Sequence, residues 1–312
     1  MYYPYLRGRL YELSALDDLA FNPTTFTKVL PIIEPVVFTE PVQKAYYTLV
    51  KRQVPFILIT NPLTGGVTKD DIEVKLINGL FEGYENYSLG FLISRLTTDH
   101  QIRAFISKYS DKNIALIHYE VPGLNDKTTE YINTLKNVSH HIFLTSFVTQ
   151  RYINSISLNG AKKIKVLDCY TKLESNTAYA EMEEEFFSDT HLTYKKDGFD
   201  GFGDFTIMGE KFDEGGGRPK AVVIHWHFIN QDKSLRIKHF ISDDRIDTTN
   251  IPGKFDEAYQ KLKFFTQNDP LHLRSVGYIE IAGKGDEGKN PQLGALKKFS
   301  MMHHFELVST LI

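Results

Sequence analysis

The chain has 312 residues, of which 42% are hydrophobic, and its formal net charge is -3. This length suffices for one large domain or two modest ones, and the small net charge gives no general attraction to nucleic acid or anionic membranes. The single cysteine, Cys169, excludes an internal disulfide framework. Because the sequence has neither a signal-peptide pattern nor an apolar run near the ~18 residues of a membrane span, we expect a cytoplasmic protein with no membrane partner.

Short apolar runs alternate with amphipathic stretches over residues 1–170. The runs predict strands at Tyr2–Leu6, Val29–Ile33, Phe56–Thr60, Tyr87–Ile93, Ile114–Tyr119, Ile142–Ser146 and Lys165–Leu167. The stretches between them predict helices at Leu10–Leu19, Pro41–Arg52, Asp70–Leu80, His100–Lys108, Thr128–Leu135 and Gln150–Leu158. Strands that are separated by helices in this way indicate βαβ units and a parallel sheet.

Such a sheet can close into an eight-stranded barrel or remain open and doubly wound. Arg7-Gly8-Arg9-Leu10 follows the first strand and lacks the Gly-x-Gly-x-x-Gly pattern of a dinucleotide-binding sheet. Together with the regular spacing, this favours an α/β fold of the (βα)8 TIM-barrel type with a C-terminal β-hairpin and helical addition. Strand eight stays open between Phe205–Met208 and Val222–Phe228, so Asp204 could lie at either end of the barrel.

The pattern changes after residue 170. We expect an acidic helix at Glu181–Phe187 and a glycine-rich loop at Gly198–Phe205. A long hairpin would follow, formed by Ala221–Phe228 and Leu235–Ile241. The last elements would be a helix at Lys254–Phe265, a strand at Val276–Ile281 and a closing helix at Leu293–Leu311. Residues 1–210 would form the barrel core. Residues 211–312 would complete or cap it within one compact domain.

Polar residues follow several of the predicted strands. Because side chains alternate along a strand, and strand ends form the site of a barrel, we expect a common cleft lined by Arg7, Glu34, Asn61, His118, Glu120 and Asp168. Carboxylates near a cation suit general acid–base catalysis, and they also suit a divalent metal such as Mg²⁺. The alternative is that these strand ends simply meet solvent and that Arg7 pairs with Glu34.

The predicted hairpin carries the run His225-Trp226-His227. His225 and His227 lie on one face of a strand, as zinc-binding histidines can. If the turn is the five residues Asn230–Ser234, His239 lies opposite His225 on that face, whereas a four-residue turn would put it on the other face. These three histidines are metal-ligand candidates. The alternative is a half-polar hairpin face with Trp226 packed beneath it.

The closing helix carries His303 and His304, and Glu306 follows three residues after His303, on the same helical surface. The spacing is not His-Glu-x-x-His, which excludes the zinc-metalloprotease pattern. We expect a buried histidine that is satisfied by the carboxylate. A catalytic role is the alternative.

Three sequence blocks stand out: Tyr-Pro-Tyr-Leu-Arg-Gly at residues 3–8, Pro-Ile-Ile-Glu-Pro at 31–35, and His-His-x-Glu at 303–306. Together they resemble an uncharacterised bacterial family related to the beta-family proteins, whose members open with a Tyr-x-Pro-Tyr-Leu-Arg-Gly block. The resemblance implies a prokaryotic cytosolic protein, often encoded beside a nuclease-like partner, in mobile-element or phage-defence neighbourhoods. It brings no established reaction with it.

Two functions follow. The first is a hydrolase acting on a phosphoester or nucleotide in an anti-phage defence or mobile-element system. Glu34 and Glu120 would be acid–base groups or metal ligands, Asp168 a second carboxylate, and Arg7 an anion clamp. The second is a non-catalytic recognition or assembly subunit for a nuclease-like partner. Carboxylates within about 6 Å of one another around an open space would favour the enzyme, and dispersed, individually paired carboxylates the binding protein.

Overall fold

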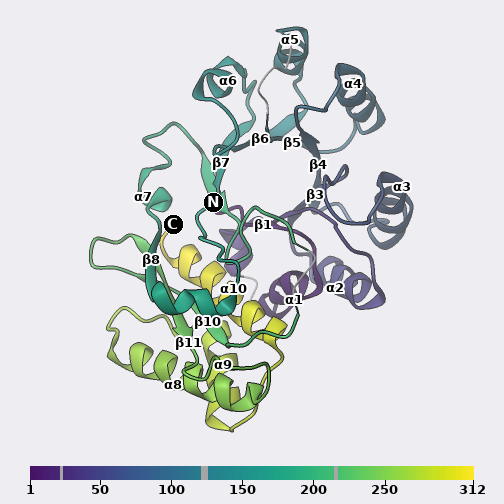
Figure 1. The fold of residues 1–312 in the computed structure, drawn as a ribbon. Coiled ribbons are helices and arrows are strands. Elements are labelled where there is room, and N and C mark those ends of the chain that lie inside the picture. The colour runs from purple at the N-terminus through teal and green to yellow at the C-terminus, as the bar shows by residue number, and fades with distance from the viewer. Residues whose placement is uncertain (22–23, 121–125, 214–216) are drawn as a thin grey trace. The chain divides into compact units, whose positions relative to one another are not determined.

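The computed structural model describes residues 1–21, 24–120, 126–213 and 217–312, which form two compact units (Figure 1). The barrel unit comprises Met1–Leu13, Phe26–Asp168 and Thr193–Phe205. The sheet unit comprises Ser14–Thr25, Cys169–Leu192 and Thr206–Ile312. The sheet unit thus includes three segments that lie within the predicted 1–210 core, residues 14–25, 169–192 and 206–210.

The barrel unit is built on eight parallel strands in the order β1-β2-β3-β4-β5-β6-β7-β9. A parallel bridge between Tyr2 and Phe202 joins the last strand to the first. The strands are β1 Tyr5–Leu6, β2 Ile32–Ile33, β3 Phe56–Ile59, β4 Tyr87–Ile93, β5 Ile114–His118, β6 Val138–Leu144, β7 Lys162–Leu167 and β9 Gly201–Asp204. The predicted (βα)8 TIM-barrel-like fold is confirmed.

Helices follow the strands and form the outer layer of the barrel unit (Figure 1). They are α2 Glu40–Lys51, α3 Lys69–Asp71 continued by the π-helix Ile72–Leu80, α4 Asp99–Lys108, α5 Asp126–Thr134 and α6 Gln150–Ser155. Between β1 and β2, α1 Leu10–Leu19 and the 3-10 helix Thr25–Thr27 belong partly to the sheet unit. The strands are apolar on both faces because one face fills the barrel and the other meets these helices. Every second residue belongs to the interior cluster: Tyr3, Tyr5, Ile32, Ile57, Ile59, Leu92, Ala115, Ile117, Ile142, Leu144, Ile164, Val166 and Phe205.

Strand eight is β9, so both predicted candidates, Phe205–Met208 and Val222–Phe228, are wrong. β9 falls in the segment predicted to be a glycine-rich loop. Its glycines allow close approach to the first strand, since a Cβ on Gly203 would lie 1.8 Å from the carbonyl oxygen of Tyr3. Asp204 ends β9 and accepts a 2.8 Å hydrogen bond from the Tyr2 hydroxyl. Asp204 is therefore buried and tied to the start of the chain.

The sheet unit contains a three-stranded antiparallel sheet in the order β10-β11-β8. Its elements are the 3-10 helix Asn176–Glu181, β8 Glu184–Ser188, α7 Thr190–Thr193, β10 Val223–Ile229, β11 Leu235–Ile241, α8 Ile251–Asn268, α9 Val276–Asp286 and α10 Leu293–Thr310. The predicted hairpin and its five-residue turn are confirmed, because His225 pairs with His239 and Ile229 with Leu235.

Two element predictions in this unit are wrong. Residues 181–187 do not form an acidic helix, since most of them belong to β8, where Glu184 pairs across the strands with Arg236. Tertiary pairing overrides the helix preference of glutamate here. The predicted strand 276–281 is the start of α9. Its N-terminus is capped by the Ser275 hydroxyl, which accepts a hydrogen bond from the backbone of Tyr278.

The closing helix α10 is buried on several sides and runs along β10. Its His303 ring stacks on Trp226, and its His304 ring on His227, each with ring centres 4.0 Å apart. Trp226 and His227 are neighbours in a strand and point to opposite faces, so α10 lies along the free edge of β10. Covering an edge strand in this way removes a site for unwanted strand pairing. Among the described helices, none combines the length and apolar character needed to cross a membrane.

Candidate functional site

Arg7 and Glu34 come together where β1 and β2 end. Tyr5 pairs with Ile32 and Leu6 with Ile33 in parallel register, so the residues that follow leave the two strands side by side. The Arg7 guanidinium forms an ion pair with the Glu34 carboxylate, and both side chains are buried. The predicted contact between these two residues is present.

The Glu34 carboxylate has a full set of hydrogen-bond donors in addition to Arg7. The Tyr5 hydroxyl donates to Oε2 at 2.7 Å, and the Leu63 backbone N–H donates to Oε1 at 2.8 Å. The Thr64 hydroxyl lies 3.5 Å from Oε1. The side chain is 0% exposed. Because a buried charge is tolerated only when it is paired and hydrogen-bonded, this arrangement accounts for the carboxylate structurally.

Arg7 is fixed by its neighbours as well. Its guanidinium carbon lies 5.2 Å from the centre of the Tyr5 ring and 5.7 Å from that of Phe205, within cation–π range. The turn after it depends on Gly8, which has a φ of +62°. The buried Glu12 carboxylate accepts hydrogen bonds from the backbone N–H groups of Arg7 and Arg9, and burial raises its pKa. The cation is thus held by a preorganised turn.

Asn61 serves the neighbouring strand. Its amide nitrogen donates to the Leu92 carbonyl, and its amide oxygen accepts from the Leu92 N–H, both at 2.8 Å. The side chain therefore extends the pairing between β3 and β4. This use of both ends of the amide gives Asn61 a structural role at the end of its strand.

His118 does not face the barrel interior, so its predicted position in the cleft is wrong. The interior residues of β5 are Ala115 and Ile117, and His118 points the opposite way. Its ring nitrogens lie 2.8 Å from the Tyr152 hydroxyl and 3.0 Å from Nδ1 of His141. Burial lowers the pKa of His118 well below its usual value and that of His141 to about 4. The pair is a neutral, hydrogen-bonded part of the helix-facing layer.

Glu120 and Asp168 lie in loops after their strands. Glu120 shares the strand parity of His118, has a φ of +47° and pairs with Arg95 at 3.6 Å. Asp168 is exposed and follows β7 at the position that continues the interior face of Ile164 and Val166. Of the six predicted cleft residues, Arg7, Glu34, Asn61 and Asp168 therefore have the interior parity, and only Arg7 and Glu34 are shown in contact.

Tyr5 and the Leu63 backbone are partners of Glu34 that were not predicted from the sequence. A signal for Tyr5 exists, because Tyr3, Tyr5 and Arg7 alternate and so share one face. The Leu63 contact depends on how the loop after β3 folds back, which no local pattern reveals. Burial, reinforced by the charge of Glu34, raises the pKa of Tyr5 well above its usual value. Tyr5 therefore keeps its proton and donates a hydrogen bond to Glu34.

The hairpin histidines belong to two separate clusters. Nδ1 of His225 lies 2.8 Å from Nδ1 of His239, and the His225 ring also contacts the Tyr170 hydroxyl at 3.3 Å. His227 instead packs between the rings of Phe187 and His304. Within the described ranges, no three His, Cys, Asp or Glu side chains are placed to hold a metal ion. Burial lowers the pKa of His225 and His227 well below the usual value.

His303 is buried as expected, but its predicted carboxylate partner is wrong. Its Nδ1 lies 2.7 Å from the Ser275 hydroxyl, and its Nε2 donates to the His227 carbonyl oxygen at 2.9 Å. Burial lowers its pKa to about 3. Glu306 accepts a hydrogen bond from the Val276 N–H at the start of α9, where a negative charge is favoured. His303 and Glu306 therefore hold α10 against β10 and the start of α9.

Comparison with known proteins adds no function. No protein-family model matches the chain, and no curated protein is significantly similar to it.

Proposed function

We propose that the protein is a non-catalytic recognition or assembly subunit, which acts with a nuclease-like partner in a prokaryotic anti-phage defence or mobile-element system. The observation that carries the non-catalytic role is the state of Glu34, whose carboxylate is 0% exposed and bound by Arg7, Tyr5 and Leu63. The biological setting and the kind of partner come from the sequence resemblance alone.

The geometric requirement of acid–base catalysis supports the non-catalytic role. A general acid or base must come within hydrogen-bond reach of the substrate proton. Glu34 has no exposed surface from which to do so. Glu120 pairs with Arg95 and has the outward parity. A magnesium site would need carboxylate oxygens and space for water, and the described residues provide no such group. Glu34 and Glu120 are thus individually paired, as expected for a binding protein.

The loops at the carboxyl ends of the strands also suit protein recognition. Leu63, in the loop after β3, is 47% exposed, and Leu96, in the loop after β4, is 79% exposed. Exposed apolar side chains that gather into a patch are a feature of protein–protein interaction sites. We propose that the partner contacts these two loops.

Co-expression with the nuclease-like partner that the sequence resemblance implies tests the proposal. We expect the two proteins to co-elute on size exclusion, and the double variant Leu63→Asp/Leu96→Asp to abolish co-elution. The matched control is Val74→Asp, which places a charge at an exposed apolar residue on the outer helix 72–80. Failure to form a complex, or a complex unaffected by the loop variant, would rule out this role.

A hydrolase is the second candidate, and it is favoured by the fixed guanidinium of Arg7 together with the exposed carboxylate of Asp168. Assay of phosphodiesters and nucleotides with Mg²⁺ tests it. Turnover that is lost in Asp168→Asn with unchanged thermal stability would establish the enzyme and replace the binding role. Absence of turnover across the panel would eliminate it.

A further inference from the structure

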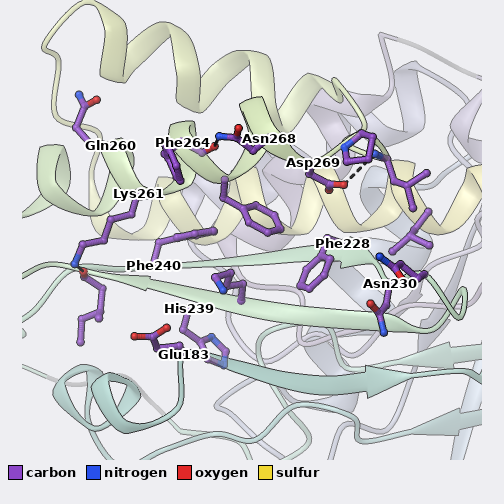
Figure 2. A pocket seen from close by; sticks show the side chains of 17 residues that line it. Glu183, Phe228, Asn230, His239, Phe240, Gln260, Lys261, Phe264, Asn268 and Asp269 are labelled. Atoms are coloured by element: carbon purple, nitrogen blue, oxygen red, sulfur yellow. Dashed lines mark hydrogen bonds between the residues drawn. The ribbon is translucent and has the colours of Figure 1, made fainter.

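A pocket of about 810 Å³ lies in the sheet unit, between α8 and the hairpin strands β10 and β11 (Figure 2). Its volume is in the range of small-molecule sites, which are mainly apolar with a few polar groups at chosen positions. Both walls contribute aromatic and polar side chains. The hairpin provides Phe228, Lys238 and Phe240, and α8 provides Lys261, Phe264, Phe265 and Asn268.

Aromatic rings form the apolar part of the pocket. The Phe265 ring lies 5.2 Å from the ring of Phe228 and 5.5 Å from that of Phe240, measured between centres. These three rings hold one another in place. Phe264, the next residue on α8, lines the same pocket but is 70% exposed. An exposed ring beside a fixed aromatic group provides a flat surface on which another ring can stack.

Amide side chains and two lysines make up most of the polar part. The amides are Asn230, Gln231, Gln260 and Asn268. Each has an oxygen acceptor and an NH₂ group, and the NH₂ groups of Asn268 and Gln260 already donate once, to the Phe264 carbonyl oxygen and to Asp256. Such groups match the edge of a heterocyclic base, whereas the apolar residues alone would also accept an alkyl chain. Rings and amides together therefore suit a planar ring that carries hydrogen-bonding atoms.

The lysines add positive charge next to the rings. Lys238 Nζ lies 5.6 Å from the Phe265 ring centre and 3.6 Å from a Glu184 carboxylate oxygen. Lys261 Nζ donates to Asp243 at 2.7 Å and to the Ile241 carbonyl oxygen at 2.8 Å. Glu184 and Asp243 are solvent-accessible, and exposed ion pairs contribute little free energy, so a phosphate can replace either carboxylate as the partner of its lysine. The acids of the lining are Glu183 and Asp269, and Asp269 already accepts the Leu271 N–H at 2.9 Å.

We propose that this pocket binds a nucleoside monophosphate, with the base stacked on Phe264 and Phe265 and the phosphate held by Lys238 and Lys261. The site belongs to the sheet unit alone and goes beyond the partner-binding role assigned to the barrel loops. Its failure would leave that role intact, because the two tests use different residues and different ligands.

Isothermal titration calorimetry of the full chain with AMP, GMP, CMP and UMP tests the proposal. We expect at least one nucleotide to bind, its nucleoside to bind more weakly, and ribose 5-phosphate not to bind. Phe264→Ala should weaken nucleotide binding about tenfold, equivalent to about 1.4 kcal/mol, because a stacking surface is lost. The matched control is Phe21→Ala in the same unit, at a phenylalanine that is 71% exposed and lies outside the pocket.

A second variant separates the phosphate from the base. Lys238→Gln should bring nucleotide affinity down towards that of the nucleoside and leave nucleoside affinity unchanged. The proposal is overturned if none of the four nucleotides binds at millimolar concentration, or if Phe264→Ala binds them as well as the parent chain. It is also overturned if decanoate binds more tightly than every nucleotide, since the pocket would then be a site for alkyl chains.

Discussion

Arg7 and Glu34 leave adjacent parallel strands at the same end of the barrel and form a buried ion pair. The pair is completed by Tyr5, whose hydroxyl donates to the same carboxylate at 2.7 Å. This carboxylate is surrounded by its own chain. The pair therefore joins β1 to β2 at the point where the strands end, and we expect its loss to lower the stability of the fold.

Glu34→Gln should destabilise the fold strongly. The substitution keeps the shape of the side chain but leaves the buried Arg7 cation without its counter-charge, which typically costs about 3–5 kcal/mol. Urea denaturation followed by circular dichroism measures the loss. Glu73→Gln is the control, because Glu73 pairs with Lys108 at the surface and should lose no more than about 1 kcal/mol. Equal midpoints for the two variants would show that the Arg7–Glu34 pair is not structural.

Gly203→Ala should impair closure of the barrel. A Cβ at this position would lie 1.8 Å from the Tyr3 carbonyl oxygen, so β9 could pair with the first strand only after a backbone shift. We expect a loss of about 3 kcal/mol or more in the free energy of unfolding, at the upper end of overpacking effects. Gly66→Ala is the control, because a Cβ there meets nothing within 4 Å. A Gly203 variant as stable as the Gly66 variant would contradict the close approach.

The fold was predictable where the hydrophobic pattern was strong. β4 was predicted at its observed bounds, Tyr87–Ile93, and the hairpin register followed from one turn length. β9 was missed because two of its four residues are glycines, which carry no strand signal and are explained only by the distant contact with Tyr3. α9 was mistaken for a strand because its apolar start hides a helix that is capped by Ser275.

The site was predictable only in part, for the same physical reason. The Arg7–Glu34 pair follows from strand order and parity, both of which are local. His118 was misplaced because parity was counted from Glu120, beyond the end of β5, where the chain turns with a positive φ. The pocket beside Phe264 is lined by the hairpin and by the later helix α8. Nothing in the sequence of either segment alone indicates that the two lie side by side.

Stability should fall in acid below the pKa of an ordinary histidine. Burial lowers the pKa of His140 and His141 to about 4, whereas the unfolded chain titrates near 6.5. Between these values the unfolded state binds more protons, so the free energy of unfolding decreases as the pH falls from about 6.5 towards about 4. Urea midpoints measured across this range test the direction.

His140→Gln isolates one of these groups. Removing a single buried histidine should flatten the pH dependence by up to about 1.4 kcal/mol per pH unit within that window. The control is His100→Gln, which removes an exposed histidine at the start of α4. If the free energy of unfolding of the His140 variant depends on pH as steeply as that of the parent chain, or more steeply, this residue takes up its proton in the folded state at least as readily as in the unfolded state.

Ser275→Ala should cost more than the loss of an ordinary helix cap. The Ser275 hydroxyl accepts the Tyr278 N–H at 3.0 Å and lies 2.7 Å from Nδ1 of the buried His303. Its removal leaves the first turn of α9 uncapped, and it also takes a hydrogen-bond partner from a histidine that must stay neutral. A cap is worth about 1 kcal/mol and a buried polar atom left without its partner about 1–3 kcal/mol more.

Thr149→Ala provides the comparison, since Thr149 caps α6 through the Tyr152 N–H at an exposed position. We expect a loss of about 1 kcal/mol there and at least about 2 kcal/mol for Ser275→Ala, both measured by urea denaturation. Ser275→Thr keeps a hydroxyl at this position and should recover most of the difference. If Ser275→Ala costs no more than Thr149→Ala, the hydrogen bond to His303 contributes nothing to the docking of α10, and the packing of its apolar side chains alone holds the helix.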